Sequence, residues 1–116
     1  MFHNMKHIAK IGPGFTIGEF EQVVLLALVR LGADAYGASI RREIEARTGR
    51  ELAISAVYIT LDRLESKGFV RSRIGDPTPQ RGGRRRKHFT LLPAGRRAIA
   101  QVCRTFSQMV EGLDLA

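Results

Sequence analysis

The sequence of 116 residues predicts a mainly α-helical fold with one small β-hairpin, on the basis of two kinds of periodicity. Apolar residues recur every three or four positions over residues 54–64 and again over residues 99–113, which is the spacing of one buried helical face. Over residues 70–74, arginines alternate with apolar or small residues, and this period of two indicates a half-buried strand. Residues 84–91 resume the extended pattern after a loop that contains Pro and Gly, so two strands are expected to pair.

Three parts are expected along the chain. Residues 1–14 have weak periodicity and end in Gly-Pro-Gly, which indicates an N-terminal arm. Residues 15–92 contain three helices and the hairpin, and residues 93–116 contain a last helix. A chain of this length buries the core of a single domain without disulfides or metal ions.

The first helix is expected to begin at residues 16–19, TIGE, which have the form of a capping box flanked by Phe15 and Phe20. Its body is apolar at nearly every position over residues 23–31, and Gly32 closes it. Because a surface helix needs only one apolar stripe, this helix is expected to be covered on both sides, with a second subunit covering one of them.

The next two helices are expected to form a helix-turn-helix pair. The second, over residues 36–48, is amphipathic and stops at Gly49. A short connector, residues 50–53, leads to the third, whose start is left open between Ala53 and Ser55.

The third helix is the element around which the other predictions are organised. Its buried stripe comprises Ile54, Val57, Leu61 and Leu64. Its opposite face comprises Ser55, Ile59, Asp62, Arg63 and Ser66, with Tyr58 on one flank and Ala56 and Thr60 on the other. Gly68 and Phe69 predict a Schellman ending. Small hydrogen-bonding side chains on an outer face are typical of a helix that enters the DNA major groove, although an ordinary solvated helix can have the same pattern.

The predicted hairpin carries the excess charge of the chain. Residues 71–97 hold nine Lys or Arg and one Asp, which equals the net charge of +8 of the whole chain. Phe89 and Leu91 are expected to face inward. A localised basic strip directly after a helix-turn-helix pair favours a nucleic acid, and the scarcity of large apolar residues in the strip disfavours a lipid surface. We therefore interpret the hairpin as a wing.

The last helix is expected to begin at Pro93, a residue suited to the first helical position. Its apolar residues repeat at alternating spacings of three and four, as in a two-heptad seam. This seam could dock on its own domain, but the first helix is apolar all round, which favours a homodimer. The expected dimer interface comprises Phe20, Val24, Ile99, Val102, Phe106, Met109 and Leu113.

No metal or cofactor site is expected, because Cys103 is the only cysteine and His3 and His7 have no third ligand. No Ser/His/Asp or Cys/His grouping converges, so an enzyme is not expected. The longest apolar run, residues 23–29, is too short to span a bilayer. These features predict a soluble, cytoplasmic binding protein with no membrane partner.

Four separated stretches resemble, in order and spacing, the PadR-like winged-helix transcriptional regulators. They lie within about residues 15–100 and read FEQVVLLALVRLG, AYGASIRREIE, AVYITLDRLESKGFV and RGGRRRKHFTLLPAGRRA. The short C-terminal part resembles the compact branch of the family, which has a single dimerisation helix. The resemblance implies a winged helix-turn-helix fold and a bacterial, repressor-type homodimer on an inverted-repeat operator of double-stranded DNA.

The resemblance also implies which residues meet DNA. The third helix would lie in the major groove through Ser55, Ala56, Tyr58, Ile59, Thr60 and Arg63. The wing would lie on the backbone or in the minor groove through Arg81, Arg84, Arg85, Arg86 and Lys87.

The sequence departs from its relatives at two points. Leu92 stands where they often have Thr, which weakens the cap of the last helix. The chain has no Trp, which disfavours the stacking of planar drugs that some compact relatives show at the dimer interface. A small-molecule effector remains a further hypothesis, with a site expected near Phe20, Val24, Phe106 and Met109.

The alternative function is a winged-helix module that binds RNA or protein without operator specificity. RNA-binding modules usually expose aromatic side chains for stacking. In this sequence Phe69 and Phe89 are assigned to the core, which leaves only Tyr58 for that role.

Overall fold

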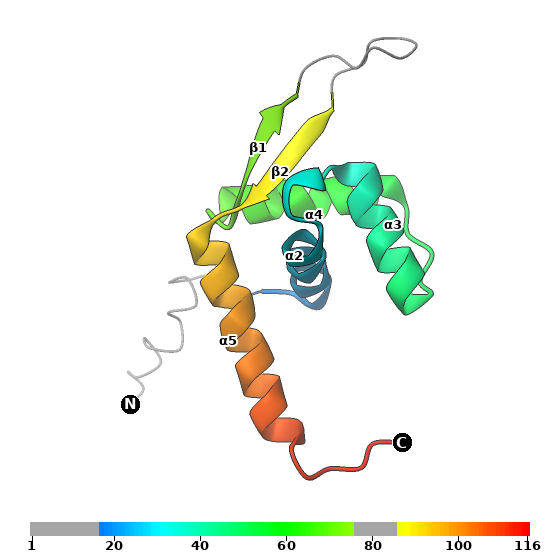
Figure 1. The fold of residues 1–116 in the computed structure, drawn as a ribbon, viewed down its shortest axis with the longest axis vertical. Helices are drawn as coiled ribbons and strands as arrows, with labels where there is room; N and C mark the ends of the chain where they lie inside the picture. Colours follow the sequence, from blue (N-terminus) through cyan, green and yellow to red (C-terminus); the bar gives the residue numbers. More distant parts are fainter. Residues whose placement is uncertain (1–16, 76–85) are drawn as a thin grey trace.

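The computed structural model describes residues 17–75 and 86–116 and confirms a mainly helical fold with one antiparallel hairpin. The elements in chain order are α2 (Glu19–Leu31), the 3₁₀ turn η1 (Gly32–Asp34), α3 (Gly37–Thr48), α4 (Ile54–Ser66), β1 (Val70–Ile74), β2 (Lys87–Leu91) and α5 (Pro93–Val110). Figure 1 shows α2 at the centre, α3 and α4 around it, the hairpin above, and α5 extending downward from the base of the hairpin.

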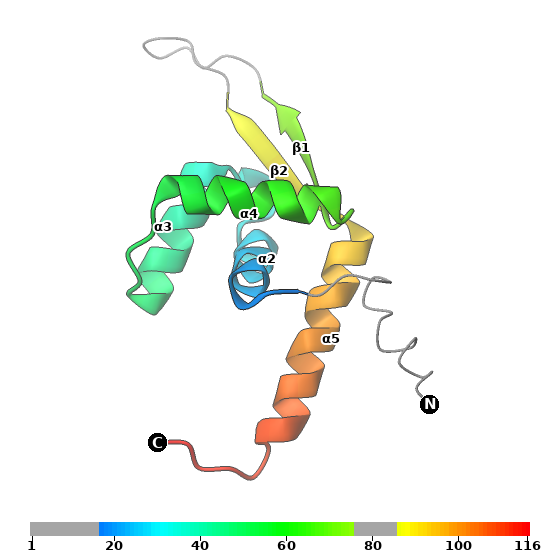
Figure 2. The same ribbon diagram turned by 180° about the vertical axis from the view of Figure 1, so that it is seen from behind.

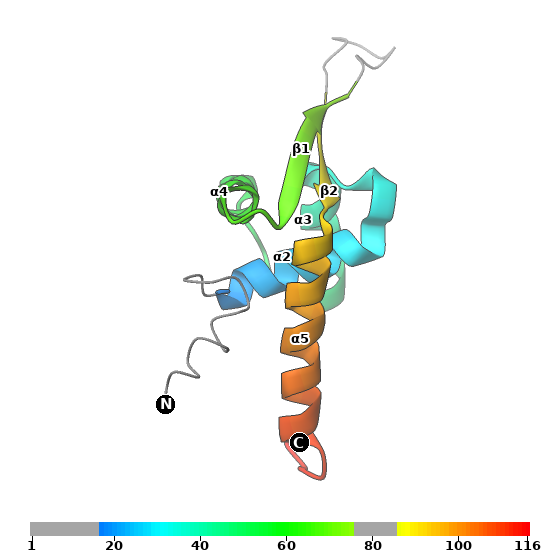
Figure 3. The ribbon, with the colours of Figure 1, turned by 90° about the vertical axis from the view of Figure 1, so that its left-hand side faces the viewer.

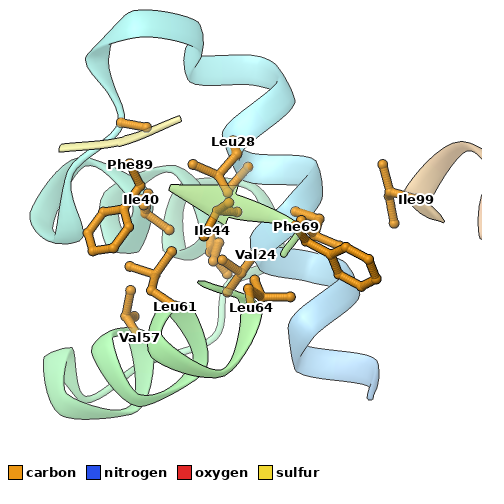
Figure 4. Packing of buried hydrophobic residues seen from close by; sticks show 14 of the residues in the cluster. Val24, Leu28, Ile40, Ile44, Val57, Leu61, Leu64, Phe69, Phe89 and Ile99 are labelled. Carbon is orange, nitrogen blue, oxygen red and sulfur yellow. The ribbon is translucent and has the colours of Figure 1, made fainter. Parts of the chain in front are cut away.

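The core lies where α2, α3, α4, the hairpin and the first turns of α5 meet (Figure 4). The predicted inward stripe of α4 is confirmed, since Val57, Leu61 and Leu64 are fully buried and Ile54 is half-buried. Phe69 and Phe89 are buried as well. In the view of Figure 2, α4 lies in front of α2 and the hairpin, so its outer face is turned toward the viewer and away from the core.

The start of α2 differs from the expected capping box. The N-cap is Gly18 rather than Thr16, and the Gly18 N–H donates to the Glu21 carboxylate at 2.8 Å. Glu21 also accepts hydrogen bonds from the Lys67 ammonium at 2.8 and 2.9 Å, so one buried carboxylate joins the start of α2 to the end of α4. Phe15 and Thr16 lie outside the described residues. The box is shifted because the Glu at the third helical position, rather than the first, can reach back to the cap.

The end of α4 is the predicted Schellman motif. The Phe69 N–H donates to the Leu64 carbonyl at 3.0 Å, and the Gly68 N–H donates to the Glu65 carbonyl at 3.0 Å. Gly68 has φ +81°, which a glycine adopts without strain. The chain therefore turns sharply from α4 into β1.

The hairpin pairs Val70 with Leu91 at its base and Ile74 with Lys87 at its outer end. Its inner face is apolar only near the base, where Val70 and Phe89 are buried. Ile74 was expected on the half-buried face but is 55% exposed, because the outer end of the hairpin extends beyond the helices (Figure 3).

The last helix begins at Pro93 as predicted. Its first turns join the core through Ala98 and Ile99, whereas the side chains from Cys103 onward are exposed. The helix ends at Val110, so the predicted seam residue Leu113 lies beyond the helix. Gly112, with φ +82°, turns the chain away before that position is reached.

Two residues expected at a dimer interface lie instead in the protomer's own core. Val24 is fully buried against α4, and Ile99 is buried where α5 crosses α2. The sequence pattern marked both residues as apolar helix positions but could not distinguish which side of each helix its own domain covers.

Replacing Gly95 with Ala should destabilise the fold. A Cβ at Gly95 would overlap the Phe69 carbonyl oxygen and lie 2.9 Å from the Leu91 Cδ1 atom, so α5 must move away from the hairpin. We expect urea unfolding to show a loss of about 1–3 kcal/mol in the free energy of unfolding, although Ala ordinarily favours a helix. Gly18→Ala is the control, because a Cβ there meets only the Glu21 carboxylate at 3.8 Å. Equal losses in the two variants would show that crowding at Gly95 is not the cause.

Candidate nucleic-acid interface

The outer face of α4 is exposed over its whole length. The polar residues Ser55, Asp62, Arg63 and Ser66 are exposed. The apolar side chain of Ile59 is 52% exposed. Ala56, on the flank, is half-buried. The outer face of α4 is therefore mostly polar, with the branched apolar side chain of Ile59 near its middle.

Thr60 was expected on a flank of this face, but its side chain is only 6% exposed. It lies one helical turn before Leu64, and residues four apart share a face of a helix. Thr60 therefore belongs to the edge of the buried stripe, and the protomer offers almost none of its surface to a ligand.

Tyr58 connects α4 to the start of α3. Its ring lies 6.5 Å from that of Phe89, and its phenol end occupies the space in which a side chain at Gly37 would stand. Position 37 must therefore be a glycine, because a side chain there would overlap the Tyr58 ring. The contact holds Tyr58 in place while 38% of its surface stays exposed.

The described part of the wing carries four exposed basic side chains, distributed over both faces of the hairpin. Arg71 and Arg73 of β1, and Arg86 and Lys87 at the start of β2, are all exposed. The Lys87 ammonium lies 5.8 Å from the centre of the Phe89 ring. Arg81, Arg84 and Arg85, which were also predicted to contact DNA, lie outside the described residues.

The base of the wing is fixed to the segment that precedes α3. The Phe89 N–H donates to the Ala35 carbonyl at 2.9 Å, and Tyr36 and His88 form an isolated β-bridge. Their rings meet edge to face with centroids 5.7 Å apart. The wing therefore keeps a fixed position relative to the helix-turn-helix pair.

Tyr36 and Arg42 also belong to this surface, although no sequence pattern predicts it. Tyr36 is half-buried at the wing base, where the Arg42 guanidinium donates to its hydroxyl at 3.2 Å. The Arg86 guanidinium lies over the same ring, 4.4 Å from its centre. No local pattern links residues 36 and 86, so only the pairing of β2 with the segment before α3 could have revealed them.

Carboxylates hold the turn between α3 and α4. The Leu52 N–H donates to Glu45 at 2.9 Å, and this bond, with a further one from Arg41, lowers the pKa of Glu45. Arg50 donates to Glu19 of α2 at 2.6 Å, which lowers the pKa of Glu19. Both bonds are strongest when the carboxylates are ionised, so the turn is best fixed above the pH range in which they take up protons.

Within the described residues, no group of three or more His, Cys, Asp or Glu side chains is placed to hold a metal ion. Over the same residues, no helix has the length and apolar character needed to cross a membrane.

The sequence profile of the transcriptional regulator PadR-like family matches residues 25–101, which include all of the helix-turn-helix pair and the hairpin. The chain belongs to the PadR-like family of transcriptional regulators. The expected family resemblance is thereby confirmed. No curated protein sequence matches the chain.

Solved structures of PadR proteins have the same fold. A PadR family transcription regulator from Clostridium difficile is 23% identical with a TM-score of 0.64, covering 81% of this chain and 92% of that one. One from Eggerthella lenta is 25% identical with a TM-score of 0.61 and 82% of each chain covered. Bacillus subtilis PadR in complex with operator DNA is 22% identical with a TM-score of 0.62, over 76% of this chain and 48% of that one.

Proposed function

We propose that the protein is a sequence-specific DNA-binding repressor that binds an inverted-repeat operator as a homodimer in the bacterial cytoplasm. The observation that carries the proposal is the exposed, mostly polar outer face of α4. It is followed directly by a basic hairpin whose base is hydrogen-bonded to the segment before α3. A helix with such a face fits the major groove, and a basic hairpin beside it fits the phosphates or the minor groove. The similarity to a PadR protein solved with operator DNA supports the same assignment.

The two elements are proposed to have different tasks. Ser55 can hydrogen-bond base edges, and Ile59 can contact a thymine methyl group. We assign Tyr58, which is held against Gly37, a phosphate contact through its hydroxyl. The wing arginines and Lys87 supply charge that attracts any duplex, and therefore contribute affinity with little sequence information.

Duplex DNA is favoured over RNA by the position of the aromatic residues. Phe69 and Phe89 lie in the core, so neither can stack on an unpaired base. Tyr58 is the exposed aromatic residue on the described part of α4 and the wing.

The proposed dimer uses the exposed part of α5. Phe106 and Met109 are 59% and 70% exposed, and Val110 and Leu113 continue this apolar surface beyond them. On α2, Leu26 and Val29 are also exposed. Apolar surface of this extent on a small domain is typical of an interface between subunits.

A hollow between α2 and α3 is a suitable receiving surface for the second copy. Its volume is about 180 Å³, and it is lined by Val23, Leu26, Ala27, Arg30, Glu43, Ile44, Arg47 and Thr48. Arg30 and Arg47 line it, and the segment that follows α5 carries Glu111 and Asp114. Apolar contact with opposite charges at the rim is the usual make-up of a protein interface.

A small-molecule effector is proposed at the same interface. Three of the expected lining residues have exposed surface, namely Phe20, Phe106 and Met109. The fourth, Val24, is fully buried in the protomer and cannot contact an effector there. An effector that binds one arrangement of the two subunits better than another would change the spacing of the two α4 helices.

Replacing Phe106 and Met109 together with Asp should dissociate the dimer. Both side chains are exposed in the protomer, so the protomer should stay folded while charges are forced into the subunit interface. We expect the dimer dissociation constant in sedimentation experiments to rise by about 100-fold or more. A control that places Asp at Gln101 and Gln108, on the opposite side of α5, adds the same charge and should leave the dimer intact. A Phe106/Met109 variant that sediments as a dimer would contradict the proposed interface.

Wing and helix variants should fail differently in DNA binding. Changing Arg84 and Arg86 to Ala should weaken binding to operator and random duplexes alike, and lower the slope of log affinity against log salt by about 1 per lost phosphate contact. Changing Ser55 or Ile59 to Ala should cost about 1–3 kcal/mol on the operator and leave the slope nearly unchanged. Salt titrations on a genomic fragment selected by the protein and on a shuffled duplex measure both effects. If the wing variants lose only specific binding and the helix variants lose both kinds, the two roles are reversed.

A further inference from the structure

Two arginines meet on one tyrosine at the base of the wing. The Arg42 and Arg86 guanidinium carbons lie 5.9 and 4.4 Å from the centre of the Tyr36 ring, and the His88 ring packs against its edge. We refer to Tyr36, Arg42, Arg86 and His88 as the Tyr36 cluster. It joins α3 to β2, and neither arginine lies on the outer face of α4.

The positive charge of the cluster has no counter-charge among the residues that the structure describes. The ion pairs there join Arg41 to Glu45, Arg47 to Glu43, Arg50 to Glu19 and Lys67 to Glu21, and none includes Arg42 or Arg86. The neighbouring Arg41 and Arg47 of the same helix are both paired with glutamates one turn away. Both guanidinium groups lie within 6 Å of the centre of one ring, and no carboxylate of the described residues pairs with either, so an anion bound beside them would be attracted by both charges.

The cluster also offers directed hydrogen-bond donors. The Tyr36 hydroxyl accepts a bond from Arg42 at 3.2 Å, so its own hydrogen is free to point to an external acceptor. The cation-π contact with the Tyr36 ring holds the Arg86 guanidinium beside the Tyr36 hydroxyl group. Arg42 and Arg86 are exposed and Tyr36 is half-buried, so an acceptor can approach from solvent.

The cluster adjoins both proposed DNA-contacting elements. Tyr36 precedes Gly37, on which the Tyr58 phenol of α4 rests, and Arg86 directly precedes β2 of the wing. Figure 1 shows the start of α3 close to both α4 and the hairpin. A duplex that meets α4 and the wing together would carry its sugar-phosphate backbone past this point.

We propose that the Tyr36 cluster binds a phosphodiester group of the DNA backbone, with Arg42 and Arg86 as charged donors and Tyr36 as a neutral donor. The proposal rests on the proposed DNA-binding function and deepens it. It assigns the second helix of the domain a direct DNA contact and makes the cation-π contact of Arg86 with Tyr36 part of the binding site.

The test is the salt dependence of binding to a mixed-sequence duplex, measured by fluorescence anisotropy between about 50 and 200 mM salt. Arg42→Gln should weaken binding by about tenfold and lower the slope of log affinity against log salt by about 1 per protomer bound. Tyr36→Phe keeps the ring under Arg86 but removes the hydroxyl, so it should weaken binding several-fold with the slope unchanged. Arg41→Gln is the matched control, because Arg41 precedes Arg42 in α3 but is paired with Glu45, and it should leave both quantities near those of the wild type.

The outcomes separate the site from the function on which it rests. If the wild-type chain binds no duplex in a salt-dependent way, both the proposed DNA-binding function and the phosphate site are contradicted. If all variants bind DNA with the wild-type slope and affinity, the Tyr36 cluster only supports the fold, and the phosphate assignment is overturned. A parallel titration with inorganic phosphate at constant ionic strength distinguishes the source of the anion. Saturable phosphate binding that Arg42→Gln abolishes, with no effect of that substitution on DNA, would also overturn the assignment to the DNA backbone.

Discussion

The packing around Phe69 fixes α4, the hairpin and α5 at the point where they meet. Its N–H closes the end of α4 by bonding to Leu64, and its carbonyl accepts the Leu92 N–H at 2.9 Å, one residue before α5 begins. Its side chain is buried in the core, and Gly95 leaves room for its carbonyl oxygen. One residue therefore sets the direction in which three elements leave the core. Close packing of this kind allows little adjustment, because interiors are as dense as organic crystals.

This constraint links the parts proposed to bind DNA and to dimerise. Because α4 and α5 are anchored at the same residue, a shift of α5 at a subunit interface would be transmitted to the recognition helix rather than absorbed in a loop. The wing is fixed separately, by the Phe89 bond to Ala35 and the contact of Tyr36 with His88. The protomer thus presents the outer face of α4, the Tyr36 cluster and the base of the wing as one connected surface, and the relative position of two protomers is the quantity that an effector could change.

Most of the fold could be predicted from local patterns. The stripe of α4, its Schellman ending, the start of α5 at Pro93 and the paired strands each depend on a few residues close together in the sequence. Errors arose where three-dimensional context decides. Thr60 sits at the border of a stripe, Val24 and Ile99 are covered by their own domain, and Leu113 lies past a turn at Gly112. The Tyr36 cluster joins residues fifty positions apart, which no periodicity reveals.

Two copies of α4 are proposed to lie in the major groove of one duplex, and methylation interference distinguishes this arrangement from binding in the minor groove. Methylation at guanine N7 modifies the major groove, whereas methylation at adenine N3 modifies the minor groove. On a genomic fragment selected by the protein, we expect two clusters of interfering guanines related by two-fold symmetry, with centres about 10 base pairs or a multiple of that apart. Interference confined to adenine N3, or a single unpaired cluster, would contradict it.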